Sequence, residues 1–389
     1  MDLDLTPEEA AFRAEARAWL AEHVPAAPLA PPETARGFAE HRAWERALYE
    51  GRWSAVPWPY VYGGREGSPV ESLVFEEEYH AAGAPVRISQ NGIALLAPTL
   101  LAHGTEEQRA RILPPMARGE TVWAQAWSEP EAGSDLAALR SVAVRTDGGW
   151  LLSGNKTWSS RAVFADRAFG LFRSHPGADR PHRGLTYALF PLDAPGVTVR
   201  PVGRLDGKPV FAEIFLDEVF VPDEDVVGEP GQGWRVAMST AGSERGTALR
   251  APGRFTAAAG RLVELWRASA EPGDTALRDR VADAVIQARA YQLYAYERVS
   301  RPERPERSGP PGPPPEAEAS LTKVFWSELD LALHETALDL LGADGELVDA
   351  EWAQGWLFAL AGPVYAGTNE IQRDVIAERL LGLPKGRRG

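Results

Sequence analysis

The chain of 389 residues has no cysteine, and nowhere in it do 18 apolar residues run together. The first absence excludes disulfide bonds and thiolate metal sites, and it suits a reducing compartment such as the cytoplasm. The second absence predicts that no segment spans a membrane. The first five residues form neither a basic nor a long apolar region, so we expect no signal peptide.

Positive charge is also scarce. The 41 lysines and arginines oppose 55 aspartates and glutamates, which gives a formal net charge of −14 at pH 7. Nucleic acid and anionic membranes repel such a chain, so neither is expected as its main partner. The length predicts two or three domains, and 13 tryptophans with a hydrophobic content of 44% predict a large apolar core.

Helical signals fill the first third of the sequence. Thr6 to Glu9 form a capping box with proline at the first helical position. An apolar stripe at helical spacing follows, made of Phe12, Ala16, Trp19 and Leu20. Further helices are expected at residues 70–82, 93–101 and 105–119, with a Pro- and Gly-rich loop at residues 57–67.

The hydrophobic period changes after Val122. Residues 146–149, Thr-Asp-Gly-Gly, predict a hairpin turn between two strands. Strands are expected at residues 141–145, 150–154, 185–190, 197–202 and 211–215. Together these strands predict a small antiparallel barrel or sandwich.

Helical spacing resumes after residues 231–233 and forms two apolar faces. The first face contains Leu277, Val281, Val285 and Ala288, and the second contains Leu321, Val324, Phe325 and Leu329. Between them, residues 301–315 hold seven prolines and predict a polyproline-like loop. The basic residues 385–388 predict a frayed tail.

The order of helices, strands and helices predicts an α+β chain of three domains. We expect an N-terminal helical domain at residues 1–121, a β-barrel domain at residues 122–231 and a C-terminal four-helix bundle at residues 232–389.

Two short stretches have the composition of a flavin site. They are residues 127–135, Trp-Ser-Glu-Pro-Glu-Ala-Gly-Ser-Asp, and residues 154–160, Gly-Asn-Lys-Thr-Trp-Ser-Ser. A flavin needs hydrogen-bond donors along its polar edge and an apolar wall against one face. Ser128 and Ser160 can donate, and Trp158 can stack. Taken singly, each pattern is equally typical of a strand start or a core tryptophan.

In this order and at this separation, the two stretches resemble the flavin-binding signatures of the acyl-CoA dehydrogenase family. A third block, residues 366–382, begins Ala-Gly-Thr-Asn-Glu-Ile-Gln-Arg and resembles the C-terminal signature of that family. The similarity covers nearly the whole chain. It implies the acyl-CoA dehydrogenase fold, FAD as cofactor and α,β-dehydrogenation of an acyl-CoA thioester, as in β-oxidation.

The same resemblance implies which residues contact the cofactor. They are Gln125, Trp127, Ser128, Gly133, Ser134, Trp158, Ser159, Ser160, Thr368 and Glu370. It also implies an electron-transferring flavoprotein as electron acceptor, and a homodimer or homotetramer, with a heterotetramer as the alternative.

The reaction needs a carboxylate that removes the α-proton in a dry pocket. In many family members this glutamate immediately precedes the Gly-Thr of the C-terminal signature, where this chain has Ala366. Other members carry the base on the helix after the barrel, immediately before an arginine, and Glu244-Arg245 matches that pattern. We therefore expect Glu244 as base, Arg245 beside it, and the Ala366 backbone N–H as an oxyanion donor. Without the resemblance, the sequence favours an ordinary helix-face Glu244 paired with Arg245 or Arg250.

Residues 253–256 and 340–345 depart from the motifs with which family members hold the adenosine end of FAD. With Ala366, this divergence resembles the bacterial branch that acts on bulky acyl groups, including steroid side chains, in which some enzymes are heterotetramers. Two other interpretations stay open: a non-catalytic or partner-dependent subunit, and a flavin oxidase or monooxygenase. A zinc site is not predicted, because residues 334–338, His-Glu-Thr-Ala-Leu, lack the second histidine.

Overall fold

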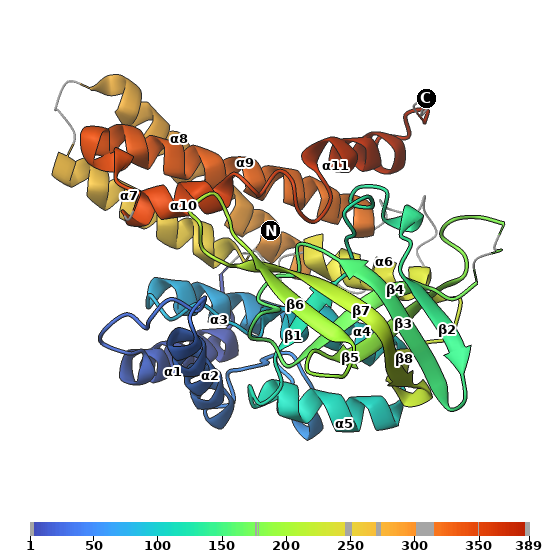
Figure 1. The fold of residues 1–389 in the computed structure, drawn as a ribbon. Coiled ribbons are helices and arrows are strands. Elements are labelled where there is room, and N and C mark those ends of the chain that lie inside the picture. The colour runs from blue at the N-terminus through green and yellow to red at the C-terminus, as the bar shows by residue number, and fades with distance from the viewer. Residues whose placement is uncertain are drawn as a thin grey trace, which may run out of the picture. The chain divides into compact units, whose positions relative to one another are not determined.

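The computed structural model describes residues 4–175, 177, 179–245, 251–269, 274–300, 315–348 and 350–385. The chain forms two compact units. The helical unit comprises residues 1–24, 67–84 and 245–389, and the sheet unit comprises residues 25–66 and 85–244. The predicted α+β fold class is confirmed, with helices before and after a run of strands in the sequence (Figure 1).

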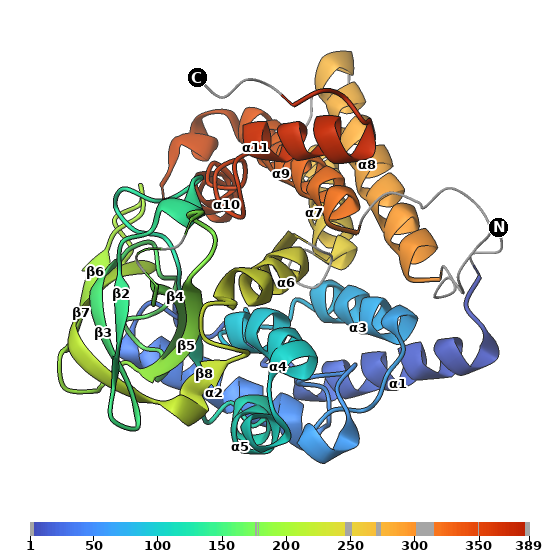
Figure 2. The ribbon, with the colours of Figure 1, turned by 90° about the vertical axis from the view of Figure 1, so that its right-hand side faces the viewer.

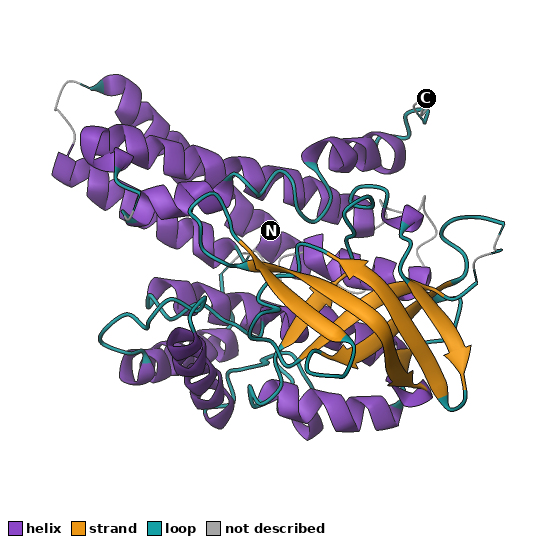
Figure 3. Cartoon of the chain, viewed as in Figure 1, coloured by secondary structure: helices purple, strands orange, loops and turns teal. Residues whose placement is uncertain are grey.

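The sheet unit is built on one twisted sheet of eight strands (Figures 1 and 3). The strands are β1 Trp123–Ala126, β2 Val142–Thr146, β3 Gly149–Lys156, β4 Arg167–Arg173, β5 Leu185–Pro191, β6 Val197–Val202, β7 Phe211–Pro222 and β8 Val226–Val227. They lie in the order β6-β7-β3-β2-β4-β5-β8, and β1 pairs with β4. The sheet is mainly antiparallel, as expected, but β1 and β2 each pair with β4 in parallel.

The five expected strands are all present. Strands β1, β4 and β8 were not predicted. Five consecutive residues of β4, Ala168 to Phe172, are buried, so the strand lacks the alternation that marks a half-exposed one. The predicted hairpin joins β2 to β3, with Thr146 paired to Gly149 and Gly148 in the left-handed region at φ 71°. The core of the sheet includes Leu152, Phe172, Phe190 and Ile214.

Helices complete the sheet unit. They are α2 Ala35–Glu50, α4 Ala97–His103, α5 Glu106–Ala117 and α6 Gly233–Arg245, with the short helices η1 Tyr60–Tyr62, η3 Leu136–Ala138 and η4 Asp223–Asp225 and the π-helix η2 Asn91–Leu96. Helix α2 was not predicted, although Thr34 caps it by accepting a hydrogen bond from the Gly37 N–H at 3.0 Å. Gly37 is required there because an added Cβ would lie 2.0 Å from the Pro31 carbonyl oxygen.

The helical unit contains the two ends of the chain. Its helices are α1 Pro7–His23, α3 Pro69–Ala81, α7 Pro252–Ser269, α8 Thr275–Val299, α9 Pro315–Leu341, α10 Glu351–Ala359 and α11 Asn369–Val375, with the 3-10 helix η5 Gly342–Glu346 and the π-helix η6 Ile376–Leu380. Helices α7, α8 and α9 contact one another and run side by side (Figure 2). The predicted capping box of α1 is present, with the Thr6 N–H donating to Glu9 at 2.9 Å.

Packing of the helical unit agrees only in part with the predicted apolar faces. Val281, Ala288 and Leu329 are buried in its core, whereas Val285 and Leu321 are each 39% exposed. Within the described residues, no helix is long and apolar enough to cross a membrane. Of the predicted loop at residues 301–315, residues 301–314 lie outside the described residues, as do residues 386–388 of the predicted tail.

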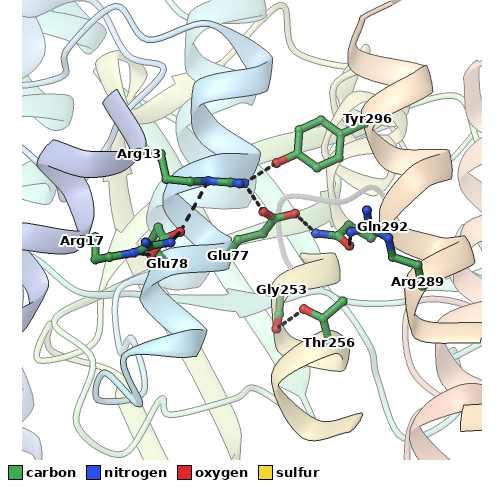
Figure 4. A network of polar contacts seen from close by, with 9 residues as sticks. All are labelled: Arg13, Arg17, Glu77, Glu78, Gly253, Thr256, Arg289, Gln292 and Tyr296. Carbon is green, nitrogen blue, oxygen red and sulfur yellow. Dashed lines mark hydrogen bonds and ion pairs between the residues drawn. The ribbon is translucent and has the colours of Figure 1, made fainter. Parts of the chain in front are cut away.

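A polar network joins α1, α3 and α8 inside the helical unit (Figure 4). Arg13 donates to Glu77 at 2.5 Å and to the Tyr296 hydroxyl at 3.1 Å. Gln292 donates to the same Glu77 carboxylate, and Arg17 binds Glu78 with two hydrogen bonds of 2.8 and 2.9 Å. These bonds satisfy two acidic side chains of α3 that lie between packed helices.

Burial lowers the pKa of His334 below its usual value of 6.5, although Asp330 opposes the shift. The ring lies in the helical unit with its Nδ1–H donating to the Asp330 carbonyl at 2.7 Å, and an added Cβ on Gly355 would lie 2.2 Å from its Nε2. The charges of Arg254 and Arg261 also disfavour protonation of the ring.

His334 is therefore expected to make the fold acid-sensitive. Below pH 6.5, His334 takes up a proton in the unfolded chain but stays neutral in the folded chain. The free energy of unfolding should therefore decrease as the pH is lowered below 6.5. Urea unfolding at pH 8, 7, 6 and 5 measures this slope. His334→Gln should show a smaller loss between pH 6.5 and 5, and equal slopes in both proteins would contradict the prediction.

Candidate functional site

The two stretches predicted to form a flavin site come together in the sheet unit. The first follows the end of β1 and the second includes the end of β3, and neither strand pairs with the other. The Thr157 N–H donates to the Ser128 carbonyl at 2.9 Å and joins them directly. Segments about 25 residues apart in the sequence thus form one local structure.

The first stretch contains a tight turn. Glu129 and Ala132 exchange backbone hydrogen bonds of 3.0 and 3.1 Å, and Gly133 and Ser134 follow it on the surface. An added Cβ on Gly133 would meet no described atom within 4 Å, and its φ is not positive. The chain's own packing therefore does not require glycine at this position. The open space beside it suits close approach of a ligand to the backbone.

One residue before this turn, Trp127, has a buried polar group without a partner among the described residues. Trp127 is 7% exposed, and among the described residues its indole Nε1–H finds no hydrogen-bond acceptor. Gln125, in β1, and Ser128 are both half-buried. An unpaired buried donor is costly unless a ligand or water completes it.

The second stretch presents a tryptophan to solvent in an unusual backbone conformation. Trp158 has φ 59°, in the left-handed region, and its side chain is 59% exposed. Its ring meets Phe211 edge-on, with 5.7 Å between ring centroids. Bulky residues seldom adopt this φ. In this conformation the Trp158 ring is exposed to solvent.

The next two residues anchor the stretch to β7. Ser159 is fully buried and exchanges backbone hydrogen bonds of 3.0 Å in both directions with Ala212. Its hydroxyl has no partner among the described residues, while Ser160 is half-buried. The buried Ser159 hydroxyl and the exposed Trp158 ring thus lie on one segment, which suits a flavin site.

The third signature lies in the helical unit, in the turn before α11. Ala366 and Gly367 are both left-handed, with φ 55° and 81°. The Ala366 carbonyl accepts a hydrogen bond from the Gln372 side chain at 3.0 Å. Thr368 caps α11 by accepting from the Ile371 N–H at 3.3 Å.

Two further contacts define this turn. Asn369, which is buried, accepts hydrogen bonds from the Lys323 ammonium at 2.7 Å and from Ser327 at 3.1 Å, which fixes the turn to α9. Glu370 is exposed, and hydrogen bonds from its own backbone N–H and from Thr368 lower its pKa below the usual value. The start of α11 therefore carries an ionised carboxylate.

Glu244 and Arg245 form the last turn of α6, Gly233–Arg245. Their side chains lie outside the described residues, so their roles stay predictions. Arg254, in the first of the two divergent motifs, is held by Asp330 through a hydrogen bond of 2.7 Å. The second divergent motif forms the end of α9 and η5.

Comparison with protein families covers nearly the whole chain. Residues 6–120 match the acyl-CoA dehydrogenase N-terminal domain, residues 124–219 the middle domain and residues 231–381 the C-terminal domain. The chain is 37% identical over 389 residues to the acyl-CoA dehydrogenase IpdE1 of Mycobacterium tuberculosis, covering 97% of this chain and 98% of that protein.

Two solved structures are similar along the full length. One is the Tcur3481-Tcur3483 steroid ACAD, with a TM-score of 0.86, 29% identity and coverage of 99% of this chain and 100% of that one. The other is the ChsE4-ChsE5 complex of Mycobacterium tuberculosis, with a TM-score of 0.81, 29% identity and the same coverage. This chain therefore belongs to the acyl-CoA dehydrogenase family, whose members are FAD-binding oxidoreductases acting on CH–CH groups.

Proposed function

We propose that this protein catalyses FAD-dependent α,β-dehydrogenation of an acyl-CoA thioester to the trans-2-enoyl-CoA, a step of lipid metabolism. The joined pair of stretches after β1 and β3 is the observation that carries the proposal. There the exposed Trp158 ring offers a stacking face, and the Trp127 indole N–H and Ser159 hydroxyl offer buried polar groups without partners among the described residues. The open space beside Gly133 suits the phosphate part of FAD.

FAD, when bound, supplies the acceptor for the hydride that leaves the substrate β-carbon. The Glu244 carboxylate takes the proton from the α-carbon, so that the C–H electron pair forms the new double bond. The backbone N–H of Ala366 donates to the thioester oxygen while negative charge grows on it. This N–H does not depend on the side chain at position 366, and the left-handed turn at Ala366 and Gly367 fixes its direction.

We further propose a bulky acyl group, such as one derived from a steroid, and an electron-transferring flavoprotein as electron acceptor. The first part is supported by the structural similarity to a steroid ACAD. An alanine at position 366, where many members carry glutamate, also leaves more room for an acyl group. The alternative with O₂ as acceptor predicts hydrogen peroxide formed at the rate of substrate loss.

A second candidate is a subunit that needs a homologous partner chain to complete its site. The similarity to the ChsE4-ChsE5 complex favours this alternative over a homo-oligomer. The divergent residues 253–256 also favour it, because they depart from the motif with which family members hold the adenosine end of FAD. A homo-oligomer with full flavin occupancy would contradict it.

An absorption spectrum of the purified protein, followed anaerobically during addition of acyl-CoA esters, tests the proposal. We expect flavin bands that bleach with a bulky ester and persist with short linear ones. A colourless or unreactive protein would favour the partner-dependent subunit. A flavin that short linear esters bleach best would contradict the proposed acyl group.

Trp158 allows a separate test of the flavin site. Trp158→Ala and Trp158→Gly should both weaken FAD binding about tenfold, because either variant removes a stacking face worth roughly 1–3 kcal/mol. Glycine tolerates the left-handed φ of 59°, so the free energy of unfolding should be about 1 kcal/mol higher for the glycine variant than for the alanine variant. FAD titration and urea unfolding measure the two effects. Unchanged FAD affinity in both variants would place the flavin elsewhere.

A further inference from the structure

A buried ion pair joins the two stretches of the proposed flavin site. Lys156 is the last residue of β3 and 0% exposed, and the Glu129 side chain is 7% exposed. The Lys156 Nζ donates to Glu129 Oε1 at 2.7 Å. Trp127 and Ser128 directly precede Glu129, and Trp158 lies two residues after Lys156. The pair thus lies between the residues expected to touch the cofactor.

Four further hydrogen bonds tie the pair to backbone groups. Lys156 donates to the Leu171 carbonyl of β4 at 2.7 Å and to the Trp127 carbonyl at 3.4 Å. Glu129 accepts from the backbone N–H groups of Arg140 at 2.6 Å and of Ser141 at 2.9 Å. The Lys156 ammonium also lies over the Phe172 ring, 4.9 Å from its centroid. One pair therefore holds β3, β4 and both stretches together.

The electrostatics match a pair that stays ionised near neutral pH. Burial lowers the pKa of Lys156 to about 8, and Glu129 opposes that shift. Burial by itself raises the pKa of Glu129, but the Lys156 charge and the hydrogen bond from Arg140 outweigh it and leave the pKa below its usual value. Buried ion pairs often add little to stability compared with apolar residues of similar volume. Stability by itself therefore does not explain why Lys156 and Glu129 occupy these positions.

We infer that Lys156 and Glu129 are positioning residues that hold the two flavin-contacting stretches in register, without touching the cofactor themselves. This inference rests on the proposed FAD site. It deepens that proposal by assigning a role to two residues of the flavin motifs whose charged groups already bind each other and backbone groups. Loss of the pair should let Trp158 and Ser128 move relative to each other, which weakens FAD binding.

A matched control exists in the same unit. Glu45 of α2 is 1% exposed and accepts one hydrogen bond from Arg87 at 2.8 Å, with two more from the backbone N–H groups of Ile88 and Ser89 at 2.9 and 3.1 Å. Its burial and hydrogen bonding closely parallel those of Glu129, but it lies in neither stretch. Glu45→Gln therefore reports the general effect of disturbing a buried pair.

The experiment compares the 389-residue chain with Lys156→Met, Glu129→Gln, the double variant and Glu45→Gln. FAD affinity is measured by titration with FAD alone, the environment of the flavin by its visible circular dichroism, and stability by the melting temperature of the chain without FAD. Each single variant should weaken FAD binding at least tenfold and change the circular dichroism of bound flavin. Glu45→Gln should lower the melting temperature by a similar amount and change FAD affinity less than twofold.

The double variant separates positioning from stability. It leaves no unpaired buried charge, so its melting temperature should return toward that of the wild type, while FAD binding stays at least tenfold weaker. If FAD affinity returns to within twofold together with the melting temperature, the pair is only structural and the inference is wrong. Wild-type protein that binds no FAD would instead overturn the proposal that this chain by itself forms the cofactor site, and this inference with it.

Discussion

Replacing Glu244 by glutamine is expected to lower kcat for dehydrogenation by roughly 10³-fold, because the amide cannot take the α-proton and general base catalysis is typically worth 10²–10⁴-fold. Glutamine keeps nearly the same volume, so FAD binding and substrate binding should persist. Anaerobic single-turnover bleaching of the flavin by an acyl-CoA ester measures the chemical step directly, and the flavin spectrum before mixing reports cofactor content.

Two further variants make this result specific. Glu264→Gln removes an exposed carboxylate of α7 and should leave the rate unchanged. Adding Ala366→Glu to Glu244→Gln places a carboxylate at the position that many family members use, and it should restore part of the lost rate. Position 366 already has φ 55°, so glutamate there meets the same backbone strain as alanine. Turnover that survives unchanged in Glu244→Gln contradicts the assignment of the base.

Gly154→Ala is expected to lower the free energy of unfolding by roughly 3 kcal/mol, the largest expected effect on stability. Gly154 has φ 147°, and an added Cβ would lie 2.2 Å from Ser141 Oγ and 2.7 Å from Ser141 Cα. The register between β3 and β7 shifts at this point, between Leu152 and Gly154. Alanine would therefore need both a disfavoured backbone conformation and a displaced neighbouring strand. Urea unfolding measures the change.

Gly133→Ala is the matched control, since both glycines belong to the predicted flavin motifs. Its added Cβ would meet nothing within 4 Å, so the free energy of unfolding should change by less than about 0.5 kcal/mol. FAD binding should weaken, because the methyl group enters the space left for the cofactor. Equal destabilisation by both substitutions would show that packing does not distinguish these two glycines.

The sequence predicted those features whose cause is local. The capping box at Thr6 and Glu9 acts within four residues, and the hairpin at Thr146–Gly149 depends on one glycine with positive φ. Strands β2 and β7 have exposed residues on one face, which makes them visible in the sequence. Strand β4 was missed and β5 was predicted, although both are buried along most of their length, because Pro191 closes β5. Helix α2 was also missed.

The flavin motifs show the same division. The family, the fold and FAD were predicted because the two stretches and residues 366–382 resemble the signatures of one family in the same order. The sequence also indicated Trp158 as a stacking residue, but its left-handed φ and outward ring depend on the bonds between Ser159 and Ala212 in β7. No pattern in the sequence indicated that Glu129 and Lys156 meet, because the first stretch also contains the acidic residues Glu131 and Asp135.

By itself, then, the sequence predicted the family through the resemblance of its three motifs, and it predicted most helices and strands through local periodicity. Only the tertiary structure decided which residues hold that site. Lys156 reaches Glu129 because β3 ends beside the turn that follows β1, and the two charges share a dry interior with the Leu171 carbonyl. Such a pair depends on strands that meet in space after folding, and no pattern along the chain specifies that meeting.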